Sequence, residues 1–173
     1  MEKQQKNSKV NISYHSGIYT LEVEQKLPIS QFEAWNFFSN PGNLSEITPT
    51  EMEFKITSGK PDRMYAGQII SYQINLLPGF KSSWITEITQ VKDLEYFIDE
   101  QRFGPYKMWH HEHRFTELES GILMHDKVSY KIPFGLIGRM VHALFIKRKL
   151  IGIFSYRINK LDAIFASGKM KIV

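Results

Sequence analysis

The stretch "GPYKMWHHEHRF", residues 104–115, places three histidines, a glutamate and a tryptophan close together. Imidazole and carboxylate groups at this density suit three kinds of chemistry. They can coordinate a metal ion, act together as a general acid and base, or form the polar lining of a pocket for an apolar molecule. The choice among the three depends on which of these side chains share a face.

This stretch is predicted to be a β-strand, whose side chains point alternately to opposite faces. One face then carries Trp109, His111, His113 and Phe115, and the other carries His110, Glu112 and Arg114. The first face holds two aromatic side chains, so we expect it to be an interior wall. His110 is expected on the outer surface.

The following strand, "ILMHDKVSYKI" (residues 122–132), supports this division when Glu117 is placed opposite Ile122. The inner pairs are then Phe115–Met124, His113–Asp126, His111–Val128 and Trp109–Tyr130, and the outer pairs include Glu112–Lys127 and Arg114–His125. Apolar residues meet inside and, apart from Arg114 opposite His125, opposite charges meet outside. A slip of one residue would turn Asp126 outward and Lys127 inward.

A metal site would need three converging ligands, and His111, His113 and Asp126 form a candidate set. The chain lacks the His-Glu-x-x-His spacing of a helical zinc site. We therefore predict neither a metal nor another cofactor.

Catalysis would use His113 as a general base oriented by Asp126. A cavity that excludes water would make this pair effective on an enolisable or dehydratable substrate. The sequence identifies no nucleophile or oxyanion donor, since Tyr130 and Ser129 are candidates only by proximity. The favoured interpretation is that His113 and Asp126 satisfy each other's hydrogen bonds and orient the polar group of a bound molecule.

Asp99 and Gln101 on the preceding strand are further candidates for this wall. The loop at Gly104–Pro105 connects that strand to the histidine strand. A change of one residue in the loop length reverses which face the two side chains occupy. The sequence therefore leaves open whether Asp99 and Gln101 point inward or outward.

The remaining elements must position this wall. Alternation over residues 19–27 predicts a half-buried strand, and Ser30 with Glu33 forms a capping box that starts a short helix. A further short turn of helix is expected within 40–49. Alternating stretches from residue 51 onward predict about six more strands in an antiparallel meander, two of them joined by a Pro-Gly turn at 78–79.

An apolar period of 3.6 residues from Pro133 to about residue 166 predicts one long C-terminal helix. An antiparallel sheet needs a cover for its apolar face, and this helix is the obvious cover. Arg157 is a charge on this mostly apolar helix. It either pairs with a carboxylate where helix and sheet meet or is solvated.

The 173 residues, of which 42% are hydrophobic and 13% aromatic, suit one folded domain. The domain is expected over 16–168, between a flexible N-terminal tail at 1–15 and a C-terminal tail at 169–173. The absence of cysteine excludes disulfides, thiolate metal sites and cysteine nucleophiles. The polar N-terminal residues lack the apolar run of a signal peptide, so a cytoplasmic location is expected.

The net charge of +4 is modest, and the basic residues are not gathered on one face with aromatic residues between them. No nucleic-acid partner is therefore expected. The one dense cluster, Lys147 to Lys149, is expected to be solvated surface charge, with peripheral contact to an anionic membrane as the alternative. Charges interrupt the apolar stretch 132–154, which is predicted not to span a membrane.

Three segments, "FIDEQRFGPYKMWHHEHRF", "ILMHDKVSYKIPFGLIGRM" and "IFSYR", carry a resemblance to a known family. They look like a bacterial ligand-binding branch of the START and pollen-allergen superfamily (SRPBCC), the polyketide cyclase or dehydrase-like branch. The order of elements over residues 17–166 resembles the helix-grip fold of that superfamily. The resemblance implies an α+β fold in which a curved antiparallel sheet of about seven strands wraps around a long C-terminal helix.

The resemblance also implies an elongated cavity between sheet and helix. Its partner would be a small hydrophobic or amphipathic molecule, lipid-like or polyketide-like. The alternatives are an enzyme of cyclase, aromatase or dehydratase type that uses His113 and Asp126 without a metal, and a regulatory protein-interaction domain. The predicted ligand-binding residues are Asp99, Gln101, Trp109, His111, His113, Phe115, Met124, Asp126, Val128 and Tyr130.

Overall fold

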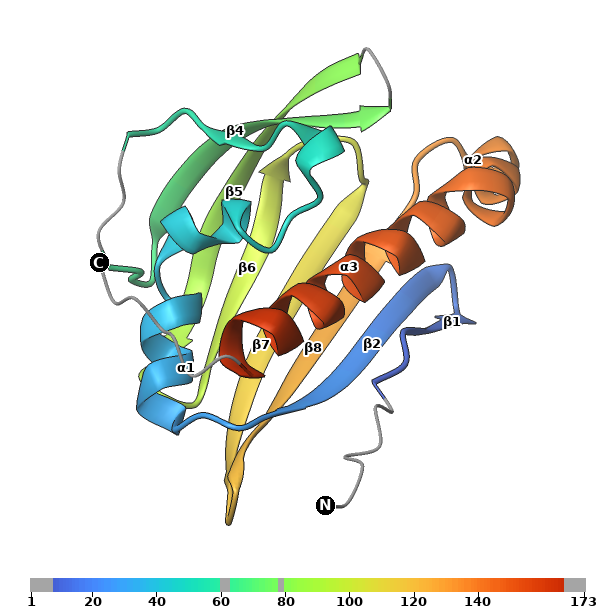
Figure 1. Ribbon diagram of the computed structural model, residues 1–173. Helices are drawn as coiled ribbons and strands as arrows, with labels where there is room; N and C mark the ends of the chain where they lie inside the picture. Colours follow the sequence, from blue (N-terminus) through green and yellow to red (C-terminus); the bar gives the residue numbers. More distant parts are fainter. Residues whose placement is uncertain (1–7, 60–62, 78–79, 167–173) are drawn as a thin grey trace.

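Eight antiparallel strands form one sheet in the computed structural model, which describes residues 8–59, 63–77 and 80–166. The strands lie in the order β1-β2-β8-β7-β6-β5-β4-β3. Their bounds are Asn11–His15 (β1), Ile18–Leu27 (β2), Lys55–Ile56 (β3), Gln68–Leu77 (β4), Phe80–Lys92 (β5), Tyr96–Phe103 (β6), Met108–Leu118 (β7) and Gly121–Lys131 (β8). Figure 1 shows the longest helix crossing this curved sheet diagonally.

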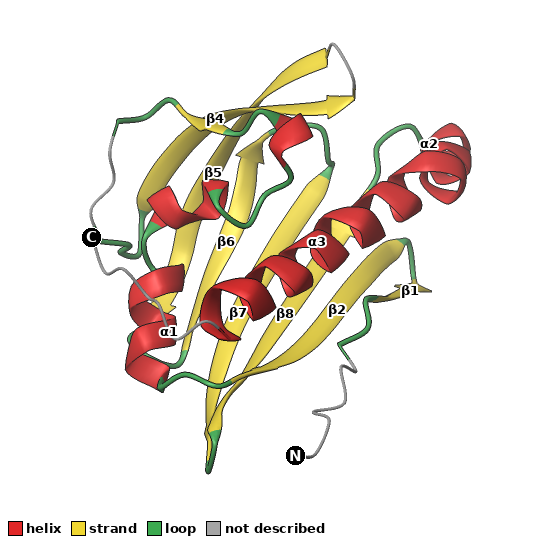
Figure 2. Ribbon diagram, viewed as in Figure 1, coloured by secondary structure: helices red, strands yellow, loops and turns green. Residues whose placement is uncertain are grey.

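The helices lie on one face of the sheet (Figure 2). Their bounds are Gln31–Phe38 (α1), Pro41–Ser45 (η1), Thr50–Met52 (η2), Gly135–Val141 (α2), His142–Ile146 (η3) and Lys147–Ala166 (α3). The α+β class and the helix-grip arrangement expected from the sequence are confirmed. Within the described part of the chain, no helix combines the length and the apolar character needed to cross a membrane.

Strand β1 lies inside the segment 1–15, which the sequence pattern predicts to be a flexible tail, so that prediction is wrong for residues 11–15. β1 pairs with β2 through a tight turn in which Ser16 and Gly17 both have positive φ, 51° and 86°. This is typical of the type I′ turn that suits twisted hairpin strands. The sheet therefore has eight strands instead of about seven. The predicted tail at 169–173 and the Pro-Gly turn at 78–79 lie outside the described residues.

The short segments after β2 largely follow their sequence signals. α1 begins at a complete capping box, in which Glu33 N donates to Ser30 Oγ (3.2 Å) and Ser30 N donates to Glu33 Oε2 (2.8 Å). The extra turn of helix expected within 40–49 is the 3-10 helix η1. The strand expected from residue 51 onward is reduced to the short β3, because Thr50–Met52 form the 3-10 helix η2.

The register between β7 and β8 is the predicted one, with His113 opposite Asp126 on the inner face. The hairpin also fits closely against β2. A Cβ atom at Gly121 would lie 2.2 Å from the Leu27 carbonyl oxygen, so only glycine allows this approach. This close approach fixes the start of β8 against the end of β2.

The C-terminal helix is continuous over residues 135–166, as the apolar period predicts, but its hydrogen-bonding pattern changes along its length. It runs as α2, then as the π-helical turn η3, then as α3. α2 lies close to the preceding loop at Gly138, where a Cβ atom would be 1.9 Å from the Pro133 carbonyl oxygen. Figure 1 shows α2 beyond the end of β2, where the sheet no longer covers it. Ile137 and Leu144, which belong to the apolar period that predicts this helix, are consequently exposed.

Helix α3 packs mainly over the β2 and β8 side of the sheet. Leu150, Phe154 and Ile158 contact apolar side chains of these two strands. The buried Gln25 on β2 donates from Nε2 to the Ile158 carbonyl oxygen (3.0 Å) and to Asp162 Oδ1 (2.8 Å), which ties the helix to this side. Over the other half of the inner face, a cavity remains.

Candidate ligand-binding cavity

The cavity has a volume of about 750 Å³ and lies between the inner faces of β4 to β7, the helices α2 and α3, and residues 40–54. Its wall is mostly apolar, with Ile70 and Ile88 from the sheet and Ile153 from α3 among the lining residues. Small-molecule sites typically have volumes of about 300–1,000 Å³, apolar walls and a few placed polar groups. This cavity has the size and the wall of such a site.

A cluster of buried polar side chains lies at the sheet side of the cavity, on three neighbouring strands. His113 Nε2 is 3.1 Å from Asp99 Oδ2, within hydrogen-bond distance. His113 Nδ1 is 2.8 Å from Asp126 Oδ1, but this second contact is ionic and is not aligned for a hydrogen bond. His111 Nε2 lies 3.3 Å from Asp126 Oδ1, and His111 Nδ1 lies 3.4 Å from Asp99 Oδ2. Each imidazole of β7 is therefore held between a carboxylate of β6 and a carboxylate of β8.

Burial and neighbouring charges set the protonation of this cluster. Burial alone would lower the pKa of His113, but Asp126 and Asp99 outweigh it, so the pKa of His113 is raised. Burial and the neighbouring His113 lower the pKa of His111. Burial would raise the pKa of both carboxyl groups, yet the imidazoles hold the pKa of Asp126 well below its usual range and lower that of Asp99. A charged His113 and Arg157 then balance two carboxylates.

Helix α3 adds Arg157 to the cluster. Its Nη1 lies 3.6 Å from Asp126 Oδ2, its guanidinium carbon is 4.9 Å from the centre of the Phe154 ring, and the residue is only 8% exposed. The structure thus shows pairing with a carboxylate, one of the two alternatives for this residue. Nε and Nη1 donate no hydrogen bond to any described residue. A buried donor without an acceptor costs about 1–3 kcal/mol, so Arg157 can offer these groups to a molecule in the cavity that it lines.

The two imidazoles should titrate on opposite sides of the ordinary histidine pKa of 6.5, with His113 above it and His111 below it. Asp126→Asn removes a negative charge beside His113, so the pKa of His113 should fall. The measurement is the pH dependence of the imidazole C–H chemical shifts by NMR. Glu100→Gln is the matched control, because Glu100 contacts His110 on the outer face (2.8 Å). Indistinguishable pKa values for the two imidazoles in the unmodified protein would contradict this charge arrangement.

The geometry suits a fixed pattern of charge better than proton removal. A general base needs an imidazole nitrogen with its lone pair toward the substrate, whereas both nitrogens of His113 face carboxylates. A different metal-ligand set from the predicted one also comes together, because ligand atoms of Asp99, His111 and His113 lie within 4.8 Å of one another. The same imidazole nitrogens already contact carboxylates, so the charges of the cluster are compensated without an ion.

Of the predicted ligand-binding residues, Asp99, Trp109, His111 and His113 line the cavity. The facing of Asp99, open from the sequence, is inward, since it pairs with His111 across β6 and β7. Gln101 does not line the cavity. Its side chain closes the loop before β7 instead, accepting from Tyr106 N (3.2 Å) and donating to the Tyr106 carbonyl oxygen (2.7 Å).

The other predicted residues are buried on the inner face but do not line the cavity: Phe115, Met124, Asp126, Val128 and Tyr130. Val128 and Tyr130 belong to the apolar cluster beneath α3, and Phe115 and Met124 pack in the cluster that includes α1. Asp126 is related to the cavity only through the cavity-lining His113 and Arg157 that it contacts. The helices occupy the space that the sequence pattern would have left for a ligand.

Sequence reasoning missed the part of the sheet wall that comes from the inner faces of β4 and β5. Its residues include Ile70, Tyr72, Ile74, Trp84, Thr86 and Ile88. The sequence does contain a signal for this wall, because Tyr72 and Trp84 are aromatic residues at alternating positions of the two strands. In the structure they lie opposite each other. Burial and the Asp99 carboxylate raise the pKa of Tyr72, so its hydroxyl, 3.1 Å from Thr86 Oγ1, stays protonated.

The chain has a helix-grip fold, and solved structures of other proteins superpose on most of it. Protein Ms6760 from Mycobacterium smegmatis superposes with a TM-score of 0.64 at 17% identity, over 92% of this chain and 99% of that chain. Ara h 8.0201 superposes with a TM-score of 0.57 at 15% identity, over 85% and 99%. Major latex-like protein 151 from Panax ginseng superposes with a TM-score of 0.64 at 10% identity, over 87% and 99%. No protein-family model and no curated protein sequence matches the chain.

Proposed function

We propose that this protein binds one small amphipathic molecule, whose apolar body fills the cavity and whose hydrogen-bond acceptor, a carboxylate or a carbonyl group, contacts Arg157. The observation that carries the proposal is a buried guanidinium group at the wall of a mostly apolar cavity, whose Nε and Nη1 atoms donate no hydrogen bond to a described residue. A purely apolar molecule would leave these donors unpaired. A lipid-like chain or a polyketide-like ring system with an acceptor group has the required chemistry.

A second donor and the charge balance of the cluster support this assignment. Trp84 Nε1 is buried without a hydrogen-bond partner among the described residues, and Trp84 lines the same cavity. Asp126 and Asp99 are neutralised by His113 and Arg157, so they do not present an uncompensated negative charge to an acceptor group. The apolar walls provide affinity, and the two donors orient the molecule.

A bulky side chain in the wall should block binding. Ile70 on β4 is 6% exposed and lines the cavity, whereas its neighbour Ile69 faces outward and is 50% exposed. We expect Ile70→Trp to weaken binding of 1-anilinonaphthalene-8-sulfonate, an apolar ring system with an anionic group, by about fivefold or more, because overpacking of this size costs about 1–3 kcal/mol. Fluorescence titration measures the affinity.

The matched variant Ile69→Trp adds the same indole on the outer face and should bind the probe as the unmodified protein does. Thermal unfolding of both variants checks that the fold is retained. Native mass spectrometry of protein purified without extraction provides a second measurement, in which a bound mass should be present and should be lost in Ile70→Trp. No probe binding by the unmodified protein, or equal binding by the two variants, would reject the cavity as the binding site.

A further inference from the structure

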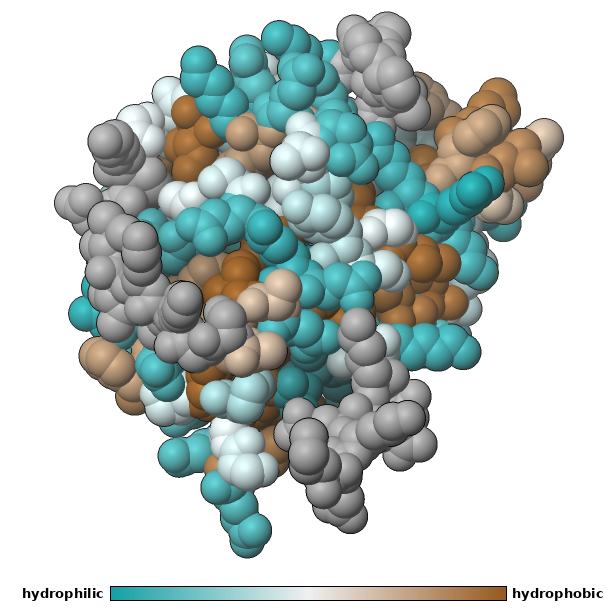
Figure 3. All heavy atoms as spheres, viewed as in Figure 1, coloured by the Kyte–Doolittle hydropathy of each residue, from teal (hydrophilic) through white to brown (hydrophobic). Residues whose placement is uncertain are grey.

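A cluster of exposed apolar side chains, here called the α2 patch, lies on α2 and η3. It consists of Phe134, Leu136, Ile137, Met140, Val141, Leu144 and Phe145, which are 43–81% exposed. Figure 3 shows hydrophobic side chains gathered at the α2 end of the molecule. Contiguous exposed apolar surface of this kind marks an interaction site in soluble proteins.

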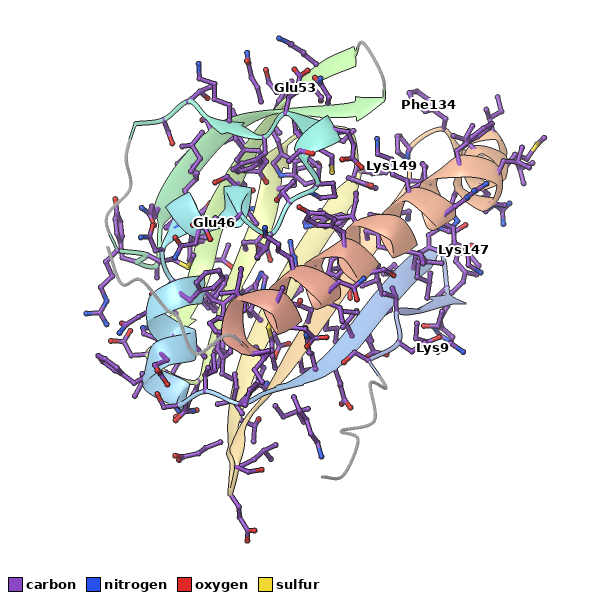
Figure 4. All side chains as sticks on the ribbon, in the orientation of Figure 1. Lys9, Glu46, Glu53, Phe134, Lys147 and Lys149 are labelled. Atoms are coloured by element: carbon purple, nitrogen blue, oxygen red, sulfur yellow. The ribbon has the colours of Figure 1, made fainter. Side chains whose placement is uncertain are left out.

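The surroundings of the α2 patch carry positive charge. Between Lys127 and Leu161 the sequence contains no aspartate or glutamate. Arg139, Lys147, Arg148 and Lys149 lie within or directly after the patch, and none of them forms an ion pair with a described carboxylate. Figure 4 shows Phe134 near the α2 end and Lys147 and Lys149 on the turns that follow. A second copy of this chain placed on the patch would bring cations against cations, whereas an anionic surface complements them.

The α2 patch has two sides. Ile137, Val141 and Phe145 are exposed and also line the cavity, so they lie at its opening. Leu136, Met140 and Leu144, spaced four residues apart, are equally exposed but do not line it. One side of the patch therefore borders the cavity opening, and the other points away from the protein.

The patch is anchored to the sheet at the π-helical turn. His142 Nε2 lies 2.8 Å from Tyr130 Oη, and the His142 ring stacks on Tyr19 with a centroid separation of 3.7 Å. Both contacts are on the side of η3 that faces the sheet, and His142 is buried. The apolar side chains are thus presented outward on a supported backbone, so little conformational entropy would be lost when they are buried.

We propose that the α2 patch docks this protein on the surface of an anionic lipid bilayer. The apolar side chains would enter the interface between head groups and acyl chains, and the four cations would contact anionic head groups. Docking in this orientation places the cavity opening against the lipid, from which an amphipathic molecule can enter. The docking itself does not depend on the proposed ligand binding. It adds to that proposal the surface that the cavity opening would face, which is the lipid bilayer.

Sedimentation with lipid vesicles tests the docking. The unmodified protein should bind vesicles of phosphatidylcholine with phosphatidylserine, bind pure phosphatidylcholine vesicles much more weakly, and dissociate as salt increases. The triple variant Leu136→Ser, Met140→Ser, Leu144→Ser should lose about tenfold or more in affinity. Lys147→Glu with Arg148→Glu should lose about fivefold or more for each charge. These positions do not line the cavity, so 1-anilinonaphthalene-8-sulfonate binding should stay unchanged.

The matched control is the triple variant Phe32→Ser, Tyr65→Ser, Phe103→Ser, which removes aromatic side chains with 61–63% exposure from other parts of the surface. It should bind mixed vesicles normally. The proposal is overturned if the unmodified protein does not bind mixed vesicles, or if it binds pure phosphatidylcholine vesicles as tightly as mixed ones. It is overturned as well if the α2 patch variant binds mixed vesicles like the control. It is also overturned if the unmodified protein is a dimer that the patch variant dissociates. Normal vesicle binding without probe uptake would reject only the proposed ligand binding.

Discussion

Asp126→Ala should lower the free energy of unfolding by about 3–5 kcal/mol, the loss found when one partner of a buried ion pair is removed. Asp126 is 2% exposed and lies 2.8 Å from His113 Nδ1 and 3.6 Å from Arg157 Nη1. Without its carboxylate, two buried cations keep only Asp99 as a counter-charge. Urea unfolding followed by circular dichroism measures the change.

Glu112→Ala is the control for this variant, because Glu112 is on the adjacent strand but forms its ion pair with Arg114 on the outer face (2.6 Å). An exposed pair of this kind contributes about 1 kcal/mol or less. If Asp126→Ala costs no more than Glu112→Ala, the buried cluster is not a major source of stability. The comparison shows how much of the lost stability comes from removing any carboxylate and how much from removing one that compensates buried cations.

The destabilisation by Asp126→Ala should depend on pH in a defined way. The lowered pKa of Asp126 means that its contribution is present above the ordinary carboxyl pKa of 3.8 and is lost as pH falls through its folded value. The raised pKa of His113 means that its contribution is complete below 6.5 and is lost as pH rises through its folded value. The difference between the two proteins should therefore be largest between these two pH values. A difference that grows steadily above pH 6.5 would contradict this assignment.

Arg157→Met should weaken the binding of a carboxylate ligand by about 10- to 100-fold, since hydrogen bonds to charged groups contribute about 1.5–3 kcal/mol. The probes are laurate and dodecanol, which share one chain length and differ in the head group. Methionine keeps much of the apolar stem of arginine, so the loss for dodecanol should be much smaller. Isothermal titration calorimetry gives both affinities.

Lys160→Met provides the control on the same helix, because Lys160 does not line the cavity. Its affinity for laurate should equal that of the unmodified protein. An equal loss of laurate and dodecanol binding in Arg157→Met would mean that Arg157 shapes the cavity and does not recognise the head group. Retained laurate binding in Arg157→Met would remove the carboxylate from the proposed function altogether.

Local patterns were sufficient to predict the β7–β8 hairpin. Alternation separates His113 from Glu112, and only one register pairs Glu112 with Lys127 while it keeps Asp126 inside. Asp99 could not be placed in this way, because its face depends on the exact length of the loop at Gly104–Pro105. Strand β1 was missed because its pairing relies on the turn at Ser16–Gly17 and not on a clear apolar pattern.

The position of the cavity depends on contacts between segments far apart in the chain. Gln25 on β2 fixes α3 over one half of the sheet. Val128 therefore packs against the helix, and Ile70 lines the cavity. Both are apolar residues on the inner face, and no local period distinguishes them. The partner of Arg157 was undecided for the same reason, since Asp126 reaches it only after the helix is docked.

The sequence by itself determined the α+β class, the inward direction of His111 and His113, and the pairing of His113 with Asp126, because strand alternation and cross-strand charge act over neighbouring residues. Only the tertiary structure decided which half of the inner face is open, where Arg157 lies, and that Ile137 is exposed. A hydrophobic period shows that a helix has an apolar face, but burial depends on what covers that face. At α2 the sheet has already ended, and the apolar face meets the solvent.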